Sequence, residues 1–353
     1  MKRTIKIGNR EIGDGCPTFI IAEMSGNHNM DFNRAVAIVE AAKAAGADAI
    51  KLQTYTADTI TLNSDSDYFM IRDESLWGGR SLYNLYQEAY TPWDWQPKLK
   101  KIADDLGIVL FSSPFDYTAI DFLEKMDVPA YKIASYEIND TPLIRYAAKT
   151  GKPIIISTGI ATISDISKAV EACHEVGNEN VILLKCTSSY PCPYEEMNIR
   201  TIPNLSETFG CLSGLSDHTY GDEVAIASVA LGAHVVEKHM TLKRSDGGVD
   251  SAFSMEADEF AHMVRHIRNA EKALGKVTYN LSKVQKDEKK SSRSLFVSKN
   301  IKAGEKFTVD NIKSVRPGYG LDPALYDKVI GKTASRDLEF AKPLELKDIV
   351  EDL

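Results

Sequence analysis

Short runs rich in apolar and β-branched residues recur along the first three quarters of the chain and alternate with amphipathic stretches. The stretches between several of them have helical spacing, as in 33–45 and 165–176, and these two end at Gly46 and Gly177, which can adopt a left-handed stop. Strands that alternate with helices pair in parallel. Eight runs predict buried strands, and they span 18–23, 48–53, 107–112, 130–135, 153–158, 181–187, 211–216 and 233–239.

Eight strand–helix units within about 260 residues predict an α/β fold, the (β/α)8 TIM barrel. A doubly wound sheet is the alternative, but it would usually carry a glycine-rich phosphate turn after its first strand. Here the first strand runs into Glu23 and the polar residues 25–28, and no GxGxxG is present. The pattern therefore favours the barrel.

The character of the chain changes after a predicted helix near 256–274. Residues 280–292 are polar and charged with few apolar positions, which indicates a linker. Residues 293–353 have short strand-like segments and glycine turns, which indicate a compact α+β module with a small core. We therefore expect a barrel domain over 1–279, a linker over 280–292 and a second domain over 293–353.

The composition excludes several classes of partner. The 353 residues include 42 Lys and Arg against 50 Asp and Glu, a net charge of −8, and no long basic block, which argues against nucleic acid. Five cysteines, odd in number and without a CxxC pair, argue against a disulfide framework and favour a reducing cytoplasm. No apolar run approaches the roughly 20 residues that span a bilayer, and the N-terminus lacks a signal sequence, so we expect a soluble protein with no membrane partner.

Polar residues close the predicted strands, where a TIM barrel carries its chemistry. Lys51, Lys132 and Lys185 lie in three different apolar strands. A buried lysine costs several kcal/mol unless it is paired or faces a polar cavity, so the three could converge on a phosphate and a carboxylate. In a second interpretation each pairs with a barrel glutamate, and in a third Lys132 or Lys185 is a Schiff-base nucleophile. The glutamates available for pairing include Glu23, Glu137 and Glu237.

Two histidines, His218 and His239, each follow a predicted strand. Neutral imidazole on a rigid strand end is a good ligand for a divalent transition metal, so the pair predicts a shared metal site. The alternative is that both are hydrogen-bonded residues of a packed rim. His28, at the end of the first strand, could approach the site, and a capping or packing role is the alternative.

The segment 68–95, between the second and third strands, contains all three tryptophans and several tyrosines. A segment of this length at the active face of a barrel is often a lid or a specificity element, and aromatic rings with polar tips suit a sugar. A helix packed on the barrel, or a dimer contact, is the alternative.

Several motifs in fixed order resemble the sialic acid synthase family, which makes nonulosonic acids. They are IIAEMSGNHN, GADAIKLQTY, FSSPFD, YKIASYEI, IISTG, KCTSSYP, GLSDHT and EKHMTL. The segments RSLFVSKNIKAGE and SVRPGYG resemble the antifreeze-like SAF domain of that family. The resemblance runs nearly end to end.

The resemblance implies a metal-dependent, phosphoenolpyruvate-dependent transferase that forms a C–C bond with an open-chain N-acetylated amino sugar. Within the family, LWGGRSLYNLYQEAYTPWDW resembles the pseudaminic acid synthases, which implies 2,4-diacetamido-2,4,6-trideoxy-L-altrose as the sugar. An N-acetylneuraminate or legionaminate synthase is the alternative within the family. A non-catalytic carbohydrate-binding protein on the same barrel is the alternative of another class.

The resemblance also implies a role for each site residue. His218 and His239 would bind a divalent metal, Mn2+ in preference to Mg2+ or Co2+, and Glu23, Glu137 and Asp250 would be the catalytic carboxylates. Arg316 would reach the sugar from the neighbouring chain of a domain-swapped homodimer. The residues implied for phosphoenolpyruvate are Lys51, Ser113, Lys132, Ser135, Ser188 and Ser216, and those implied for the sugar are Gln53, Tyr190 and Asp250.

Overall fold

The structure, a computed structural model, describes residues 3–72 and 76–352. The chain divides into two compact units, 1–275 and 276–353, and each is described by itself. Among the helices of the described residues, none has the length and apolar character needed to cross a membrane.

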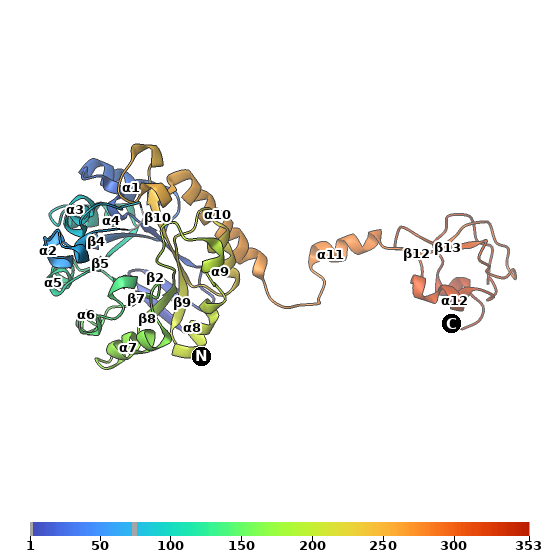
Figure 1. The fold of residues 1–353 in the computed structure, drawn as a ribbon. Helices are drawn as coiled ribbons and strands as arrows, with labels where there is room; N and C mark the ends of the chain where they lie inside the picture. The colour runs from blue at the N-terminus through green and yellow to red at the C-terminus, as the bar shows by residue number, and fades with distance from the viewer. Residues whose placement is uncertain (1–2, 73–75, 353) are drawn as a thin grey trace. The chain divides into compact units, whose positions relative to one another are not determined.

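Eight parallel strands form a closed barrel in the first unit (Figure 1). The strands pair in chain order, and the last of them pairs with both its predecessor and the first, which closes the ring. The predicted TIM barrel is therefore confirmed, with each strand within a few residues of its expected position. The strands are β3 (Phe19–Glu23), β4 (Ala49–Thr54), β5 (Val109–Pro114), β6 (Tyr131–Ile133), β7 (Ile154–Ser157), β8 (Val181–Lys185), β9 (Leu212–Asp217) and β10 (Val235–Thr241).

Helices connect successive strands and pack on the outside of the barrel. Local signals fix their ends: the Asp31 side chain caps the first helix by accepting from Asn33 N and Arg34 N, and Gly107 ends another in the left-handed conformation. The main helices are α1 (Phe32–Ala44), α3 (Leu82–Ala89), α4 (Gln96–Leu106), α5 (Tyr117–Lys125), α6 (Thr141–Ala148), α7 (Ile163–His174), α8 (Thr201–Phe209), α9 (Glu223–Ala230) and α10 (Ala257–Leu274).

An antiparallel hairpin that the sequence analysis missed precedes the barrel. It consists of β1 (Thr4–Ile7) and β2 (Arg10–Gly13). Its buried isoleucines, including Ile7, join the same apolar cluster as Phe19 at the start of β3. The hairpin therefore covers the end of the barrel where the strands begin, and the end where they finish remains available for a site.

The second unit has its own small core, formed by residues such as Leu295, Phe307 and Leu344. Its strands β12 (Ser294–Val297) and β13 (Ile312–Val315) are antiparallel. The segment expected to be a linker contains a short helix, α11 (Lys283–Glu288), with no buried residue. The exposure of these residues agrees with their polar sequence, and their assignment as a linker stays a prediction.

Candidate active site

The register of the barrel determines which side chains point into it. Paired residues of neighbouring parallel strands face the same way, and successive residues alternate. Gln53 pairs with Ser113, and Ser216 pairs with Glu237. From these pairs and the alternation along each strand, the inward-facing residues at the strand ends are Glu23, Lys51, Gln53, Ser113, Lys132, Ser157, Ser216, Glu237 and His239.

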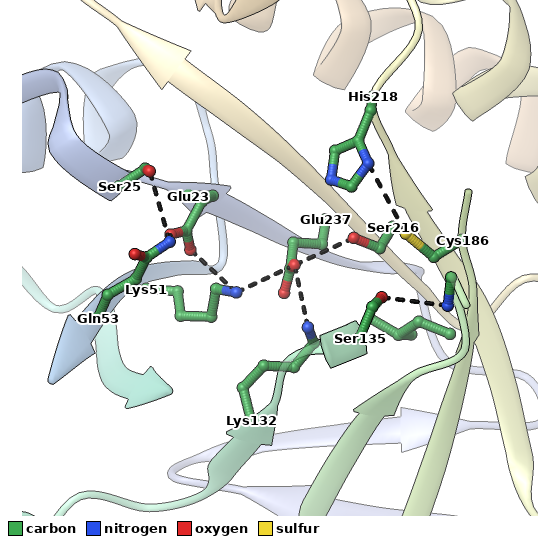
Figure 2. Close-up of polar contacts among 12 residues, drawn as sticks. Glu23, Ser25, Lys51, Gln53, Lys132, Ser135, Cys186, Ser216, His218 and Glu237 are labelled. Carbon is green, nitrogen blue, oxygen red and sulfur yellow. Dashed lines mark hydrogen bonds and ion pairs between the residues drawn. The ribbon is translucent and has the colours of Figure 1, made fainter. Parts of the chain in front are cut away.

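Two buried lysines and two buried glutamates form the centre of this face (Figure 2). Lys51 Nζ lies 3.0 Å from Glu23 Oε2 and 3.0 Å from Glu237 Oε1. Lys132 Nζ lies 3.4 Å from the same Glu237 oxygen, which also accepts from Ser216 Oγ at 3.2 Å. Lys51 and Lys132 thus converge, as one interpretation predicted, and they also pair with glutamates, as the other predicted.

The cluster separates the pKa values of its two glutamates. Burial would raise the pKa of Glu237, but Lys132 and Lys51 outweigh it and lower that pKa to about 2. Burial raises the pKa of Glu23 to about 7, against the opposing pull of Lys51. Burial also lowers the pKa of Lys132, whereas for Lys51 the two glutamates outweigh burial and raise it. Glu237 is therefore the permanent anion of the cluster.

Lys185 does not join the other two lysines, and that expectation was wrong. It pairs with Leu215, whereas its neighbour Leu184 pairs with Gly214, two residues before the inward-facing Ser216. Alternation therefore directs Lys185 away from the centre. Its Nζ donates to the carbonyl of Cys186 at 2.6 Å and to Thr187 Oγ1 at 3.2 Å. In the described chain it forms no salt bridge.

Several serine hydroxyls near the lysines lack a partner. Among the described residues, Ser113 Oγ, Ser157 Oγ and Ser188 Oγ are buried and make no hydrogen bond. Buried hydroxyls are normally hydrogen-bonded, so orphans beside two ammonium groups point to an anion that binds there. Ser135 Oγ accepts from Gly159 N at 3.1 Å.

Gly159 is necessary for this arrangement of hydroxyls. A Cβ atom built on Gly159 would overlap Ser188 Oγ and would lie 2.7 Å from Ser135 Oγ and 3.1 Å from Cys186 Sγ. The backbone of Gly159 does not have a positive φ. Its missing side chain, rather than its conformational freedom, is what the site requires.

His218 and His239 lie together at one side of the cluster, with ring centroids 5.4 Å apart. His218 Nδ1 lies 3.0 Å from the carbonyl oxygen of Thr187, so in the neutral ring Nδ1 carries the proton and Nε2 has the free lone pair. Burial, assisted by His218 and Lys51, lowers the pKa of His239 well below its usual value, so this ring is neutral. Burial would lower the pKa of His218, but Cys186 and the Thr187 carbonyl outweigh it and raise that pKa. A metal ion would bind both rings in their neutral form, and two buried imidazoles this close fit a divalent cation, although the described residues include no cluster of three or more His, Cys, Asp and Glu that could hold one.

A cysteine that the sequence analysis did not select lies beside this pair. Cys186 Sγ lies 3.7 Å from His218 Nδ1 (Figure 2). Burial would raise the pKa of Cys186, but His218 outweighs it and lowers that pKa to about 7. Glu237 was likewise considered only as a partner for lysine. Its signal was its position two residues before His239, on the same face of β10.

The three predicted catalytic carboxylates surround the same region. Gln53 Nε2 donates to Glu23 Oε1 at 2.9 Å, and Ser25 Oγ donates to Asp250. Gly26 N donates to Asp250 Oδ2 at 3.2 Å, although burial still raises the pKa of Asp250. Burial raises the pKa of Glu137 to about 7. Each is therefore easier to protonate than an ordinary surface carboxyl.

Aromatic rings border the histidine pair. The Tyr190 ring lies 4.2 Å from the His218 ring and 5.1 Å from that of Phe253. Phe253 lies 5.0 Å from His239. Trp77, from the 68–95 segment, lies 5.8 Å from Tyr190 and 6.4 Å from Phe253. Residues 73–75 of that segment lie outside the described residues.

Two further residues were considered in the sequence analysis, His28 and Arg316. His28 is buried, with Nε2 3.3 Å from Thr91 Oγ1 and its ring 5.7 Å from Trp95, so it has the packing role. Burial lowers the pKa of His28 to about 4. Arg316 is exposed and follows β13 in the second unit. Within residues 1–275 the structure thus brings the predicted site residues together, while their individual roles, and that of Arg316 in the second unit, stay predictions.

Comparison with known proteins adds independent findings. A model of the NeuB family matches residues 38–279, and a model of the SAF domain matches residues 292–350. A pseudaminic acid synthase of Campylobacter jejuni subsp. jejuni serotype O:23/36 (strain 81-176) is 47% identical over 330 residues, which cover 94% of this chain and 96% of the relative. The pseudaminic acid synthase of Helicobacter pylori (strain ATCC 700392 / 26695) is 44% identical and covers 96% of this chain and 99% of its own.

A solved structure has a similar fold. The N-acetylneuraminic acid (sialic acid) synthetase from Leptospira borgpetersenii serovar Hardjo-bovis, crystallised in complex with citrate, superposes with a TM-score of 0.73 at 32% identity. The match covers 82% of this chain and 95% of that one.

Proposed function

This chain belongs to the NeuB family, and from that premise we propose that it condenses phosphoenolpyruvate with 2,4-diacetamido-2,4,6-trideoxy-L-altrose to give pseudaminic acid and inorganic phosphate. The choice of sugar is supported by 44% and 47% identity to two pseudaminic acid synthases over nearly the whole chain. The chemistry is supported by the site itself.

One observation carries the phosphoenolpyruvate end of the proposal. Ser113 and Ser157 at strand ends, and Ser188 after β8, have buried hydroxyls without partners among the described residues. They lie at the same end of the barrel as the two buried ammonium groups. Phosphoenolpyruvate carries a phosphate and a carboxylate, and both accept charge-assisted hydrogen bonds. Lys51 and Lys132 supply the charge. Ser113, Ser135, Ser188 and Ser216 supply further polar contacts.

A divalent cation, Mn2+ in preference to Mg2+ or Co2+, binds His218 and His239 in this proposal. Imidazole nitrogen favours first-row transition-metal ions, whereas Mg2+ prefers oxygen ligands, and the choice of Mn2+ among the transition metals follows the family resemblance. With two protein ligands the coordination sphere has room for the sugar aldehyde and water. The bound ion would polarise the aldehyde oxygen. His218 is held for this role by the Thr187 carbonyl.

In this proposal the carboxylates stabilise the charge that develops during the reaction and transfer its protons. A bond forms between C3 of phosphoenolpyruvate and the aldehyde carbon, whose oxygen takes up a proton, and positive charge develops at C2. Water adds at C2 and loses one proton. The C2–O bond to phosphate then breaks as the C2 carbonyl forms, and the remaining hydroxyl proton leaves with the phosphate. Ionised Glu23, Glu137 and Asp250 would stabilise the positive charge. Glu137, with a pKa of about 7, is suited to accept the proton of water near neutral pH.

The sugar contacts Gln53, Tyr190 and Asp250 and, from a second copy of the chain, Arg316. A domain-swapped homodimer is supported by charge: residues 276–353 contain 16 Lys and Arg against 12 Asp and Glu, whereas residues 1–275 contain 26 against 38. It is also supported by exposed apolar side chains in the segments between a barrel strand and the next helix or at the first residue of that helix, namely Tyr117, Ile160, Ile163, Tyr194 and Tyr220.

We assign the enzyme to the cytoplasm, because all five cysteines are free thiols, which a reducing compartment preserves. Phosphoenolpyruvate would also be available there.

Phosphate release from phosphoenolpyruvate tests the function. The purified enzyme is supplied with Mn2+ and with the altrose, with N-acetylmannosamine, or with the corresponding 2,4-diacetamido-2,4,6-trideoxymannose. Turnover of the altrose alone, abolished by chelation, is expected. Preference for either other sugar would instead identify an N-acetylneuraminate or legionaminate synthase. If the protein binds a sugar but releases no phosphate from phosphoenolpyruvate with any of the three sugars, it is a non-catalytic carbohydrate-binding protein.

A further inference from the structure

Trp77 is brought to the histidine pair by a turn within the 68–95 segment. Met70 and Ser81 form an antiparallel bridge, and Ile71 N donates to Arg80 O at 2.9 Å. The chain reverses between these residues, and the indole Nε1 of Trp77 donates to the carbonyl oxygen of Val249 at 2.9 Å. Trp77 is therefore tied to the loop that carries Asp250, although more than 170 residues separate them in sequence.

Trp77, Tyr190 and Phe253 form one continuous aromatic wall. Each ring packs against the other two, with centroids between 5.1 and 6.4 Å apart. Phe253 is only 4% exposed, whereas Trp77 and Tyr190 remain partly exposed. Tyr190 and Phe253 also contact the histidine rings. The wall thus extends from the histidine pair outward, with Trp77 at its far end.

We propose that Trp77 determines sugar specificity, by presenting an apolar surface to the terminal methyl group, C6, of the substrate. This inference rests on the proposed function, in which the aldehyde end of the sugar lies at His218 and His239. The far end of an open-chain sugar then extends along the wall. A 6-deoxy sugar ends in a methyl group, which aromatic carbon accepts, whereas a C6 hydroxyl would lose its hydration there without gaining a partner.

A second tryptophan of the same segment, Trp93, has a structural role and contrasts with Trp77. Trp93 Nε1 donates to the carbonyl oxygen of Tyr55 at 3.0 Å, and its ring packs on Phe122 at 4.8 Å. Phe122 belongs to α5, on the outside of the barrel. Trp93 has no ring contact with the histidines or with Tyr190 in the described residues, so it is the matched control for Trp77.

The test compares two sugars that differ at a single atom. One is 2,4-diacetamido-2,4,6-trideoxy-L-altrose, and the other is the same altrose with its C6 hydroxyl restored. We expect wild-type kcat/KM to favour the deoxy sugar by about 10- to 100-fold, the range in which apolar pockets discriminate. Trp77→Ala should reduce that preference to about threefold or less, Trp77→Phe should reduce it partly, and Trp93→Phe should keep it. The KM for phosphoenolpyruvate should stay unchanged in all three.

A third sugar separates the terminal methyl from the acetamido methyls. In this analogue a formamido group replaces the C4 acetamido group. If Trp77→Ala changes the response to this analogue but not to the C6 hydroxyl, Trp77 recognises the acetamido methyl and the C6 assignment is overturned. If both Trp77 variants keep the wild-type preference, Trp77 has no part in specificity.

The folded state of each variant is checked by circular dichroism. If Trp77→Ala does not fold, the sugar preference of Trp77→Phe alone tests the proposal. An undiminished preference in Trp77→Phe would then overturn the proposal. Failure of the wild-type enzyme to turn over either altrose is a separate result, because it contradicts the proposed function rather than the role of Trp77.

Discussion

The Lys51 ammonium group and the Glu237 carboxylate lie 3.0 Å apart, and each side chain is only 4% exposed. Because Glu237 also holds Lys132, its charge keeps two buried cations together. Replacing one member of a buried ion cluster leaves the others without compensation, which typically costs about 3–5 kcal/mol.

Glu237→Gln should therefore lower the free energy of unfolding by about 3–5 kcal/mol, measured by urea denaturation at pH 7. It should also raise the KM for phosphoenolpyruvate, because Lys132 loses the anion that positions it. Glu175→Gln is the control: Glu175 pairs with Arg145 on the surface at 2.5 Å, and its loss should cost at most about 1 kcal/mol. Equal stability of both variants would contradict the role of Glu237.

Glu137 should make stability depend on pH. Burial raises its pKa from 4.5 to about 7, so between those values the folded protein holds a proton that the unfolded chain has released. The free energy of unfolding then falls as pH rises through this window, by up to about 3 kcal/mol from this group. Glu137→Gln lacks this titration. Its stability relative to wild type should rise between pH 4.5 and pH 7.5, and a pH-independent difference would contradict the raised pKa.

Metal binding should raise thermal stability only while both histidines are present. At one hundred times its dissociation constant, a ligand stabilises the folded state by about 2.7 kcal/mol. Mn2+ should therefore raise the Tm of wild type in a thermal-shift assay, and His218→Asn and His239→Asn should each lose most of that increase. His174→Asn, on α7 beside Glu179, should keep it. Equal shifts in all four proteins would exclude these ligands.

Arg316→Ala should raise the KM for the sugar about 10- to 100-fold, the loss expected for a hydrogen bond to a charged group, and leave the KM for phosphoenolpyruvate unchanged. Lys328→Ala removes an exposed charge from the same unit and is the control.

A mixing experiment tests where that arginine acts. Arg316→Ala chains, assayed at a sugar concentration well below their raised KM, and inactive His218→Asn chains are combined and allowed to exchange subunits. In a domain-swapped dimer, a mixed pair has one intact site, so about a quarter of the wild-type activity should return. No recovery from a mixture that has exchanged would show that Arg316 serves the site of its own chain, and a fully active monomer would show the same.

The sequence predicted the barrel well because the strands of a parallel barrel are buried on both faces and stand out as apolar runs. It missed the hairpin of β1 and β2, because four-residue strands with alternating polarity give little signal. It did not predict α11, because this six-residue helix buries no residue and so lacks an apolar face.

The sequence predicted those site residues that stand out as polar positions at the ends of apolar strands. Lys185 was misplaced because strand membership alone does not say which way a side chain faces; the pairing of Lys185 with Leu215 does. Glu237 was underrated because its importance depends on lysines from two other strands, β4 and β6. Cys186 meets His218 only across strands, and no sequence spacing encodes that contact.

The site depends on Gly159, a residue that has no reactive group of its own. The hydroxyls of Ser135 and Ser188 and the thiol of Cys186 approach one another only because this residue ends at its α-carbon. Adding one methyl group would displace the Ser188 hydroxyl, one of the groups proposed to hold the substrate's anion, while every lysine, histidine and carboxylate stayed in place. We expect such an enzyme to lose its activity although all of its ionisable groups are present. The missing side chain of Gly159 is therefore as necessary to the site as its charged groups.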